Sequence, residues 1–437
     1  MPEIPEQPIA RVLAPLQRFL HVEAASGVVL LACALIALLL ANSPASEAFL
    51  GFWKTPVGLQ LGDFELRHSL QHWINDGLVV VFFFVIGLEV KREIVLGQLR
   101  ELRKAMLPLA AAIGGMVVPA LVYVLLLGDD PARRGWGIPM ATDIAFVVGC
   151  MAVLGRRVPL GMRALLLSLA IADDIGAILV IAIGYTESID FTALGLGLTG
   201  IGVVVVMQRV GVRSIGVYGI IGVGIWLAFH ESGVHATIAG VVLGLMTPAR
   251  AHLSKTTVGD LVDRAGAIFR GEEWEGTSHR AEKVRGFARV TRESLSPLEY
   301  LEGTLHPWVG FGVMPLFALA NAGVPFELDD LGDPVALAVG AGLVVGKPVG
   351  IVAFAYLAVR LGLASLPQGV SWRMVLGGGF LAGIGFTMAL FIAGLALESP
   401  ALDVAKVGVL VASVVAALAG VGVLMTAPSR PASSDPS

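Results

Sequence analysis

Residues 161–184 read GMRALLLSLAIADDIGAILVIAIG, an apolar stretch with two adjacent acids, Asp173 and Asp174, near its middle. A helix that crosses the hydrocarbon core of a bilayer needs about 20 mostly apolar residues, and this stretch is long enough. An ionised side chain at the centre of such a helix costs at least about 2.5–3.5 kcal/mol, so it is a candidate for function. The stretch therefore predicts a membrane-spanning helix that carries part of a site.

The composition of the whole chain agrees with a membrane protein. The 437 residues are 56% hydrophobic and only 15% charged, and the mean hydropathy is +0.82. Such values exclude an ordinary soluble domain, and a net charge of −4 argues against a nucleic-acid partner. Cys33 and Cys150 both lie in apolar stretches, which indicates packing residues and neither a disulfide nor a metal pair.

Twelve apolar segments approach or reach the length of a spanning helix, and lipid requires that each be helical. The predicted spans are residues 25–41, 71–90, 105–127, 137–154, 161–184, 191–208, 214–229, 232–248, 306–323, 334–359, 374–397 and 404–427. Most of the 30 lysines and arginines fall in the connecting segments on one side, the side of both termini. An excess of positive charge marks the cytoplasmic side, so we expect both termini in the cytoplasm.

The segments outside the spans are expected to differ from one another. Residues 42–70 form an outside loop in which the alternation at 57–61 and the turn pair Gly62-Asp63 predict a β-hairpin. The polar edge of that hairpin can pair with a second copy of the chain. We assign residues 1–24 to a cytoplasmic interfacial segment, 25–427 to the transport domain, 250–305 to a charged cytoplasmic loop without assigned chemistry, and 428–437 to a disordered cytoplasmic tail.

Two spans contain interruptions. The fourth carries Pro139 and Ala141-Thr142-Asp143, and the eleventh carries two glycine clusters, 377–379 and 383–385. The third to fifth spans enter the bilayer from the opposite side to the tenth to twelfth, and interrupted spans at matching places in inverted halves indicate a transporter site. Close helix packing is the alternative explanation for the glycines. The predicted fold is an all-α polytopic membrane protein of about twelve transmembrane helices, with inverted-topology repeats and two broken, crossing helices.

Four ionisable groups stand out deep inside spans, namely Asp143, Asp173, Asp174 and Lys347. An excess of negative charge suits a cation, and hard cations such as Na⁺ prefer carboxylate, hydroxyl and carbonyl oxygens, which Thr142 and its unwound backbone would add. Protons compete with Na⁺ for the same carboxylates, and such competition is the chemistry of antiport. A purely structural ion cluster is the alternative, although hydrophobic replacements would usually be at least as stable.

Adjacent residues on a helix point about 100° apart, so Asp173 and Asp174 can have different roles. Half-helices that end in mid-membrane expose positive N-termini and negative C-termini. Asp143, a negative side chain beside a break, is suited to offset a positive N-terminus. Lys347 can face a C-terminus or pair with Asp173, and the sequence does not choose between these.

Several motifs, in this order, resemble the bacterial NhaA-type sodium/proton antiporters, a family that exemplifies inverted repeats. They are Trp73-Ile-Asn-Asp-Gly77, Gly87-Leu-Glu-Val-Lys-Arg-Glu93, Ala141-Thr-Asp-Ile-Ala-Phe146, Asp173-Asp174, Ser232 to Gly240, Leu305-His-Pro-Trp308, Gly346-Lys-Pro348 and Gly383-Ile-Gly-Phe-Thr-Met388. The resemblance implies a cation and proton site at Asp173 and Asp174, supported by Asp143 and Thr142, with Lys347 as partner of Asp173. It also implies exchange of internal Na⁺ or Li⁺ for external protons across the bacterial inner membrane. A homodimer through the hairpin, around residues 54–67, and the absence of a cofactor are further implications.

A second group of residues matches family positions associated with activation at alkaline pH. These residues are Glu89, Arg92, Glu93, His235, Glu302 and His306. Where the family pattern has a histidine after Glu302, this chain has Gly303, so the set-point is not predicted. The pairs His68/His72 and His230/His235 are interpreted as interfacial side chains, because no Glu or Cys completes a metal site.

Two titratable groups that serve one monovalent cation predict electrogenic exchange of about two protons per Na⁺. Other functions are also considered. An intramembrane aspartyl protease would use Asp143 and Asp173 as a dyad, but would leave Lys347 without a role. A cation channel would use the same acids without proton coupling, and K⁺ would be an alternative cargo for an antiporter.

Overall fold

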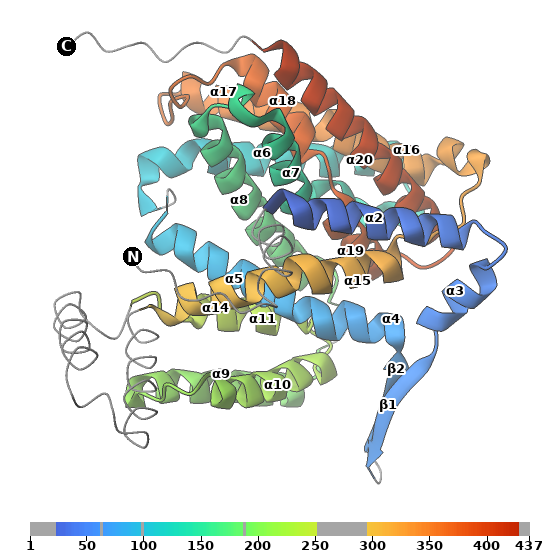
Figure 1. Cartoon of the computed structure of the whole chain (residues 1–437), viewed down its shortest axis with the longest axis vertical. Coiled ribbons are helices and arrows are strands. Elements are labelled where there is room, and N and C mark those ends of the chain that lie inside the picture. Colours follow the sequence, from blue (N-terminus) through green and yellow to red (C-terminus); the bar gives the residue numbers. More distant parts are fainter. Residues whose placement is uncertain (1–22, 62–63, 98–99, 187–188, 251–294, 428–437) are drawn as a thin grey trace, which may run out of the picture.

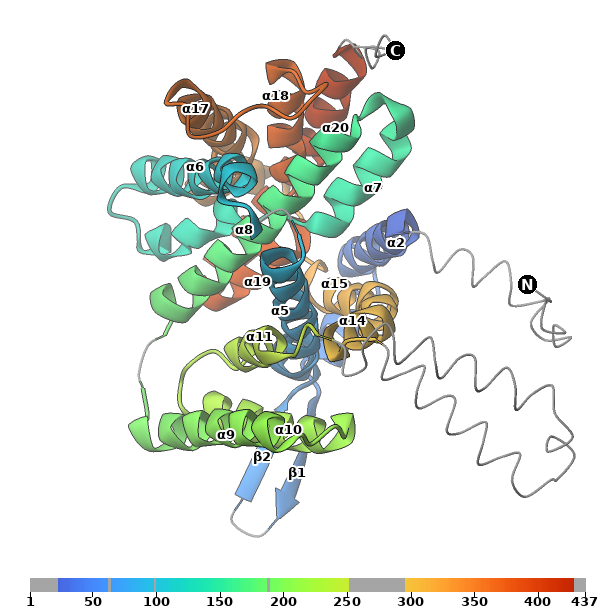
Figure 2. The ribbon, with the colours of Figure 1, turned by 90° about the vertical axis from the view of Figure 1, so that its left-hand side faces the viewer.

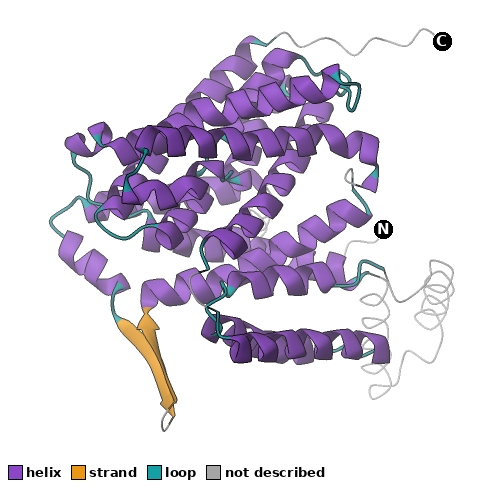
Figure 3. Cartoon of the chain, turned by 180° about the vertical axis from the view of Figure 1, so that it is seen from behind, coloured by secondary structure: helices purple, strands orange, loops and turns teal. Residues whose placement is uncertain are grey.

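The computed structural model describes residues 23–61, 64–97, 100–186, 189–250 and 295–427. Most of the expected interfacial segment 1–24, most of the loop 250–305 and the tail 428–437 lie outside the described residues. The described part is almost entirely helical, with one pair of strands (Figure 3).

The first half of the chain contains the hairpin and the helices that follow it. Its elements are α2 (Glu23–Ala41), α3 (Ser46–Trp53), β1 (Pro56–Leu61), β2 (Phe64–Ser69), α4 (Leu70–His72), the π-helical η1 (Trp73–Leu78), α5 (Val79–Val95), α6 (Leu102–Leu127), the 3-10 helix η3 (Pro131–Met140), α7 (Ile144–Leu154), the short η4 (Gly155–Arg157), α8 (Leu160–Gly184), α9 (Phe191–Val210), α10 (Ile215–Glu231) and α11 (Thr237–Met246). Figure 1 shows α9 and α10 side by side along the lower edge of the bundle, and the turned view in Figure 2 shows α11 between this pair and α5.

The second half of the chain is helical throughout its described part. Its elements are α14 (Pro297–Trp308), the π-helical η6 (Val309–Val313), α15 (Met314–Asn321), the short η7 (Leu328–Gly332), α16 (Pro334–Ala341), the π-helical η8 (Gly342–Gly346), α17 (Lys347–Arg360), α18 (Trp372–Ala382), α19 (Phe386–Ala396) and α20 (Ala401–Thr426). α16, α17, α18 and α20 gather with α6, α7 and α8 in the upper part of Figure 1, while α14 and α15 lie against α2 and α5.

The described helices include seven that are long and apolar enough to cross a membrane, or eight if the bent pair α18 and α19 is one span. Residues 25–41 of α2, together with α10 and α11, form shorter apolar helices. The protein is therefore an all-α, multi-pass membrane protein, whereas the count of twelve spans and the inverted repeats stay predictions.

The strands β1 and β2 pair antiparallel, from Pro56 opposite Ser69 to Leu61 opposite Phe64. The pair projects away from the helices (Figure 3). Its base is tied to the bundle by Trp73, whose indole Nε1 donates to the carbonyl oxygen of Val57 at 2.7 Å.

The helix α14 begins at Pro297, nine residues before the predicted span that starts at 306. Ser296 is its N-cap and forms a capping box with Glu299, while Pro297 occupies the first helical turn. The helix therefore starts before the apolar segment predicted as a span, and the cap is the sequence signal for this start.

α6 and α17 approach each other closely through two glycines. A Cβ atom on Gly114 would lie 2.2 Å from the carbonyl oxygen of Gly350, so no side chain fits there. This close packing of small residues is typical of helices in membranes. It fixes α17 against α6 less than one turn from Lys347.

Candidate functional site

The middle of α8 carries Asp173 and Asp174, which are only 2% and 4% exposed. Lys347 at the start of α17 and Asp143 between η3 and α7 are buried as well, at 0% and 3%. The structure therefore places all four predicted intramembrane charges in the interior.

Two interrupted segments meet beside these charges. In the first, residues 141–143 are extended between η3 and α7; in the second, residues 383–385 separate α18 from α19, which are bent by 48°. The backbone N–H of Asp143 donates to the carbonyl oxygen of Ile384 at 2.7 Å. The two breaks are thus joined directly, backbone to backbone.

The carboxylate of Asp143 caps the second half-helix of the other segment. Its Oδ2 accepts from the backbone N–H of Thr387 at 3.1 Å and from the Thr387 hydroxyl. Thr387 lies in the first turn of α19, where unpaired N–H groups make a positive end. Asp143 therefore offsets a half-helix N-terminus, as its position beside the break suggested.

Lys347 contacts both of the groups that the sequence offered as alternatives, namely Asp173 and the C-terminal end of a half-helix. Its Nζ donates to Asp173 Oδ2 at 2.5 Å and also to the carbonyl oxygen of Met140, the last residue of η3. The ammonium thus pairs with a carboxylate and with the negative C-terminal end of a half-helix.

Thr142 links Asp173 to the second break. Its Oγ1 lies 2.6 Å from Asp173 Oδ2 and 2.9 Å from the carbonyl oxygen of Ala382, the last residue of α18. A threonine hydroxyl has one proton, so it can donate to only one of these oxygens at a time. The direction of this bond therefore depends on whether Asp173 carries a proton.

Asp173 and Asp174 differ sharply in their surroundings. Asp173 Oδ2 is held by Lys347 and Thr142, and Asp173 Oδ1 is buried without a hydrogen-bond partner, whereas no described residue forms a hydrogen bond with either carboxylate oxygen of Asp174. The charged groups near enough to act on Asp174 are Asp173, Glu89, Asp143 and Lys347, so acids outnumber bases around it. A buried carboxylate in such surroundings can bind a proton or a small cation.

The residues predicted to sense pH do not form a single cluster in the structure. On the faces of α5 and α14, Arg92 forms an ion pair with Glu302, and His306 Nδ1 lies 3.3 Å from Glu89 Oε1. Glu93 accepts from the Ser168 hydroxyl of α8 at 3.1 Å.

His235 is not part of this group. It lies between α10 and α11, and the charged group that acts on it is Asp76, before the start of α5. Asp76 and Glu89 are separated by about 20 Å along the helix at 1.5 Å per residue. The structure therefore brings Glu89, Arg92, Glu302 and His306 together and leaves His235 at the opposite end.

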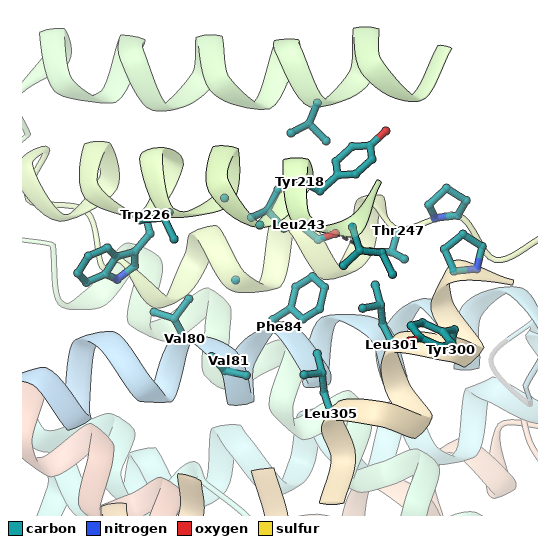
Figure 4. A pocket seen from close by; sticks show the side chains of 18 of the residues that line it. Val80, Val81, Phe84, Tyr218, Trp226, Leu243, Thr247, Tyr300, Leu301 and Leu305 are labelled. Atoms are coloured by element: carbon teal, nitrogen blue, oxygen red, sulfur yellow. Dashed lines mark hydrogen bonds between the residues drawn. The ribbon is translucent and has the colours of Figure 1, made fainter. Parts of the chain in front are cut away.

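Two cavities are lined in part by residues of α5. One, of about 690 Å³, has both apolar and polar residues in its lining, and the polar ones include Glu93, Lys104 and Ser168. It reaches α8 at Ser168, about 8 Å along the helix from Asp173. The other, of about 790 Å³, is apolar and lies between α5, α10, α11 and α14 (Figure 4), and none of the intramembrane aspartates lines it.

Sequence reasoning named no role for several groups that the structure places in the site. These are Thr387, Ser168 and the carbonyl oxygens of Met140 and Ala382. A threonine directly after an interrupted segment is a recognisable helix-start signal, but the carbonyl groups carry no signal in the side-chain sequence.

A family described as Na⁺/H⁺ antiporter 1 matches residues 17–424 of the chain. The chain belongs to this family. A relative named Na(+)/H(+) antiporter NhaA from Rhodopirellula baltica is 56% identical over 428 residues, which is 98% of this chain and 97% of the relative. A protein of the same name from Rhizobium meliloti is 51% identical over 429 residues, with 98% of both chains covered. The Na(+)/H(+) antiporter NhaA 2 from Vibrio vulnificus is 48% identical over 406 residues, covering 93% of this chain and 91% of the relative.

Membership of the Na⁺/H⁺ antiporter 1 family confirms the resemblance that the motifs indicated. It makes the chain a member of a transporter family and not of an enzyme family.

Proposed function

We propose that the protein exports Na⁺ and Li⁺ across a bacterial inner membrane in exchange for external protons, and that Asp174 is the group for which cation and proton compete. The observation that carries the proposal is the difference between the two adjacent acids. One carboxylate oxygen of Asp173 has fixed partners, while neither carboxylate oxygen of the buried Asp174 has a hydrogen-bond partner among the described residues. Asp173, Asp143 and Thr142 supply further oxygens beside it.

The proposed exchange moves about two protons for each Na⁺. Binding of Na⁺ from the inside releases one proton from Asp174 and a second from the coupled pair Asp173–Lys347. The 2.5 Å contact between Lys347 Nζ and Asp173 Oδ2 supports a shared titration. After the site reorients, Na⁺ leaves outside and two protons replace it, so each cycle carries about one positive charge inward.

The proposed path from the cytoplasm runs through the cavity at Glu93 and Ser168, which reaches the N-terminal half of α8. The contacts of Arg92 with Glu302 and of His306 with Glu89 hold α14 to α5 beside this path. We propose that loss of protons from this group activates exchange at alkaline pH.

The proposed topology has twelve spans, inverted repeats and both termini in the cytoplasm. The seven long helices, the bent pair, the three shorter apolar helices and α5 together give twelve. The hairpin then lies outside, and its free strand edge is suited to pairing with a second protomer.

Reconstitution into proteoliposomes tests the exchange. We expect Na⁺ and Li⁺ each to dissipate an imposed ΔpH, and K⁺ to do so much less. A cation channel would instead pass current without moving protons. With ΔpH clamped at zero by K⁺ and valinomycin, the Na⁺ gradient reached at equilibrium should change with the membrane potential, at about 2.3 kcal/mol per charge per 100 mV. A gradient that is insensitive to potential would mean one-for-one exchange.

A further inference from the structure

The end of the bundle that carries the hairpin holds three histidines from three different elements. His68 lies in β2, His72 in α4 and His230 in the last turn of α10. One ring nitrogen from each can be chosen such that all three lie within 4.8 Å of one another. The ring centroids are 4.2 Å apart for His68 and His72, and 5.4 and 5.6 Å from these to His230.

A carboxylate stands beside the three rings. Asp76 Oδ2 lies 3.4 Å from His72 Nε2 and 3.9 Å from His230 Nδ1. His72 Nε2 is buried and is not hydrogen-bonded to any described residue. Asp76 belongs to the π-helical η1, and such wide turns are frequent at functional sites.

The backbone around the cluster is held in place without an ion. The indole Nε1 of Trp226, one turn before His230 on α10, donates to the carbonyl oxygen of Asp76 at 2.8 Å. Ser69 caps α4, and its hydroxyl accepts from the backbone N–H of His72 at 3.1 Å. The elements that carry the histidines are thus fixed relative to one another, which pre-organises a site.

The donor set differs in kind from that of the transport site. Imidazole nitrogens suit Zn²⁺, Cu²⁺ and Ni²⁺, whereas Na⁺ prefers oxygen. Three histidines with one further position are a common zinc arrangement, with Zn–N distances of about 2.0–2.1 Å. Ligand nitrogens at such a zinc lie roughly 3.4 Å apart, so the rings need to move inward by about 1 Å. The side chains of His72 and His230 are 37% and 17% exposed, which leaves room for rotation and access for an ion.

We propose that His68, His72 and His230 bind one transition-metal ion, with Zn²⁺ as the best fit, and that Asp76 supplies the neighbouring carboxylate. The ion joins the base of the hairpin to the end of α10. It stabilises the folded protein and takes no part in the Na⁺ and proton exchange, because the site uses none of the intramembrane charges.

Zinc binding is measured on purified protein without a polyhistidine tag, by competition with a chromophoric chelator. We expect one Zn²⁺ per chain from this site. His68→Gln and His230→Gln should each weaken its binding by roughly 100-fold or more, and Asp76→Asn by about 10-fold. His306→Gln, which changes a histidine beside Glu89 and Arg92, is the matched control and should leave the affinity unchanged.

A second readout does not depend on variants that could fail to fold. Co²⁺ added to the wild-type protein should give the intense visible absorption of four-coordinate cobalt, and equimolar Zn²⁺ should abolish it. Zn²⁺ should also raise the melting temperature of the wild type but not of His230→Gln. Weak absorption typical of six-coordinate Co²⁺, or zinc affinity that is equal in the wild type and in both histidine variants, would overturn the proposal.

Discussion

The broken-helix centre, around Asp143, Asp173, Asp174 and Lys347, and the hairpin end, around His68, His72 and His230, both gather ionisable side chains. At the centre the charges are almost fully buried, and half-helix ends and opposite charges satisfy most of them. At the hairpin end the histidine side chains are partly exposed, and the carboxylate beside them is that of Asp76, 3.4 Å from His72 and 3.9 Å from His230. The difference teaches that buried charges need partners from the protein itself, and in our proposal the carboxylate of Asp174, with which no described residue forms a hydrogen bond, is where the transported ion competes with a proton.

Asp174→Asn should have the largest effect on the centre. The change removes the charge for which Na⁺ and protons compete, so we expect Na⁺-driven proton release from proteoliposomes to fall below detection. Insertion and expression should be retained, because a neutral amide is easier to bury than a carboxylate.

The matched control for this variant is Asp190→Asn. Asp190 is an exposed N-cap of α9, and its bonds from the backbone N–H groups of Ala193 and Thr192 lower its pKa below the ordinary value. Asparagine caps a helix about as well as aspartate, so transport should stay near the wild-type level. Near-normal transport by Asp174→Asn would remove the basis for the assignment of the cation site.

Lys347→Ala tests whether the charges at the centre depend on one another. Removing one partner of a buried pair leaves Asp173 without its cation, and we expect the stability to fall by about 3–5 kcal/mol. The loss is measured by unfolding in detergent, where the melting temperature should drop clearly.

A double variant separates the effect of the Lys347–Asp173 pair on stability from its effect on transport. Replacement of both members, Lys347→Met with Asp173→Leu, should restore much of the stability, because apolar residues often replace a buried ion pair without loss. Transport should not return, since the second titratable group is gone. A melting temperature unchanged in Lys347→Ala would show that the pair does not hold the centre together.

Thr387→Val should have a smaller effect at the same place. It removes the hydroxyl that donates to Asp143 but leaves the backbone N–H bond, so we expect a cost of about 1–3 kcal/mol. Thr387→Ser keeps the hydroxyl and should be close to wild type. Equal melting temperatures for the valine and serine variants would contradict this role for the hydroxyl.

Much of the centre was predictable from the sequence because its signals are local. Asp173 and Asp174 are conspicuous within an apolar stretch, and Thr142-Asp143 and the glycines of 383–385 mark the breaks. The residues themselves left the partner of Lys347 open, and only the family resemblance implied its pairing with Asp173, which the structure contains.

The hairpin end depends on contacts that sequence reasoning did not place. His68 and His72 had only an interfacial interpretation, since no nearby Cys or Glu completed a metal site. The third histidine of the cluster, His230, comes from a helix far along the chain, and only the packing of α10 against η1 brings it there. The early start of α14 at Pro297 is a different case, because the capping signal was present in the sequence.

The smallest predicted effect is a change in the pH dependence of exchange, and it distinguishes the two ends of α5. At acid pH a protonated His306 attracts Glu89, and together with the ion pair of Arg92 and Glu302 this contact holds α14 against α5. A neutral imidazole attracts a carboxylate much less, so loss of its proton weakens the contact as the pH rises. The His306 side chain is 54% exposed, so the contact is worth no more than about 1 kcal/mol.

His306→Gln is neutral at every pH and imitates the deprotonated histidine. We therefore expect the pH of half-maximal Na⁺/H⁺ exchange to move to a lower value, by less than about one unit, because one unit corresponds to about 1.4 kcal/mol. His235→Gln is the control at the opposite end of α5, where the acting charge is Asp76 and none of the α14 residues takes part, and its profile should match the wild type. Both variants are compared between pH 6 and 8.5 in the same proteoliposome assay. A shift in the His235 variant that equals or exceeds the shift in the His306 variant would place the pH response at the hairpin end instead of at the contact between α5 and α14.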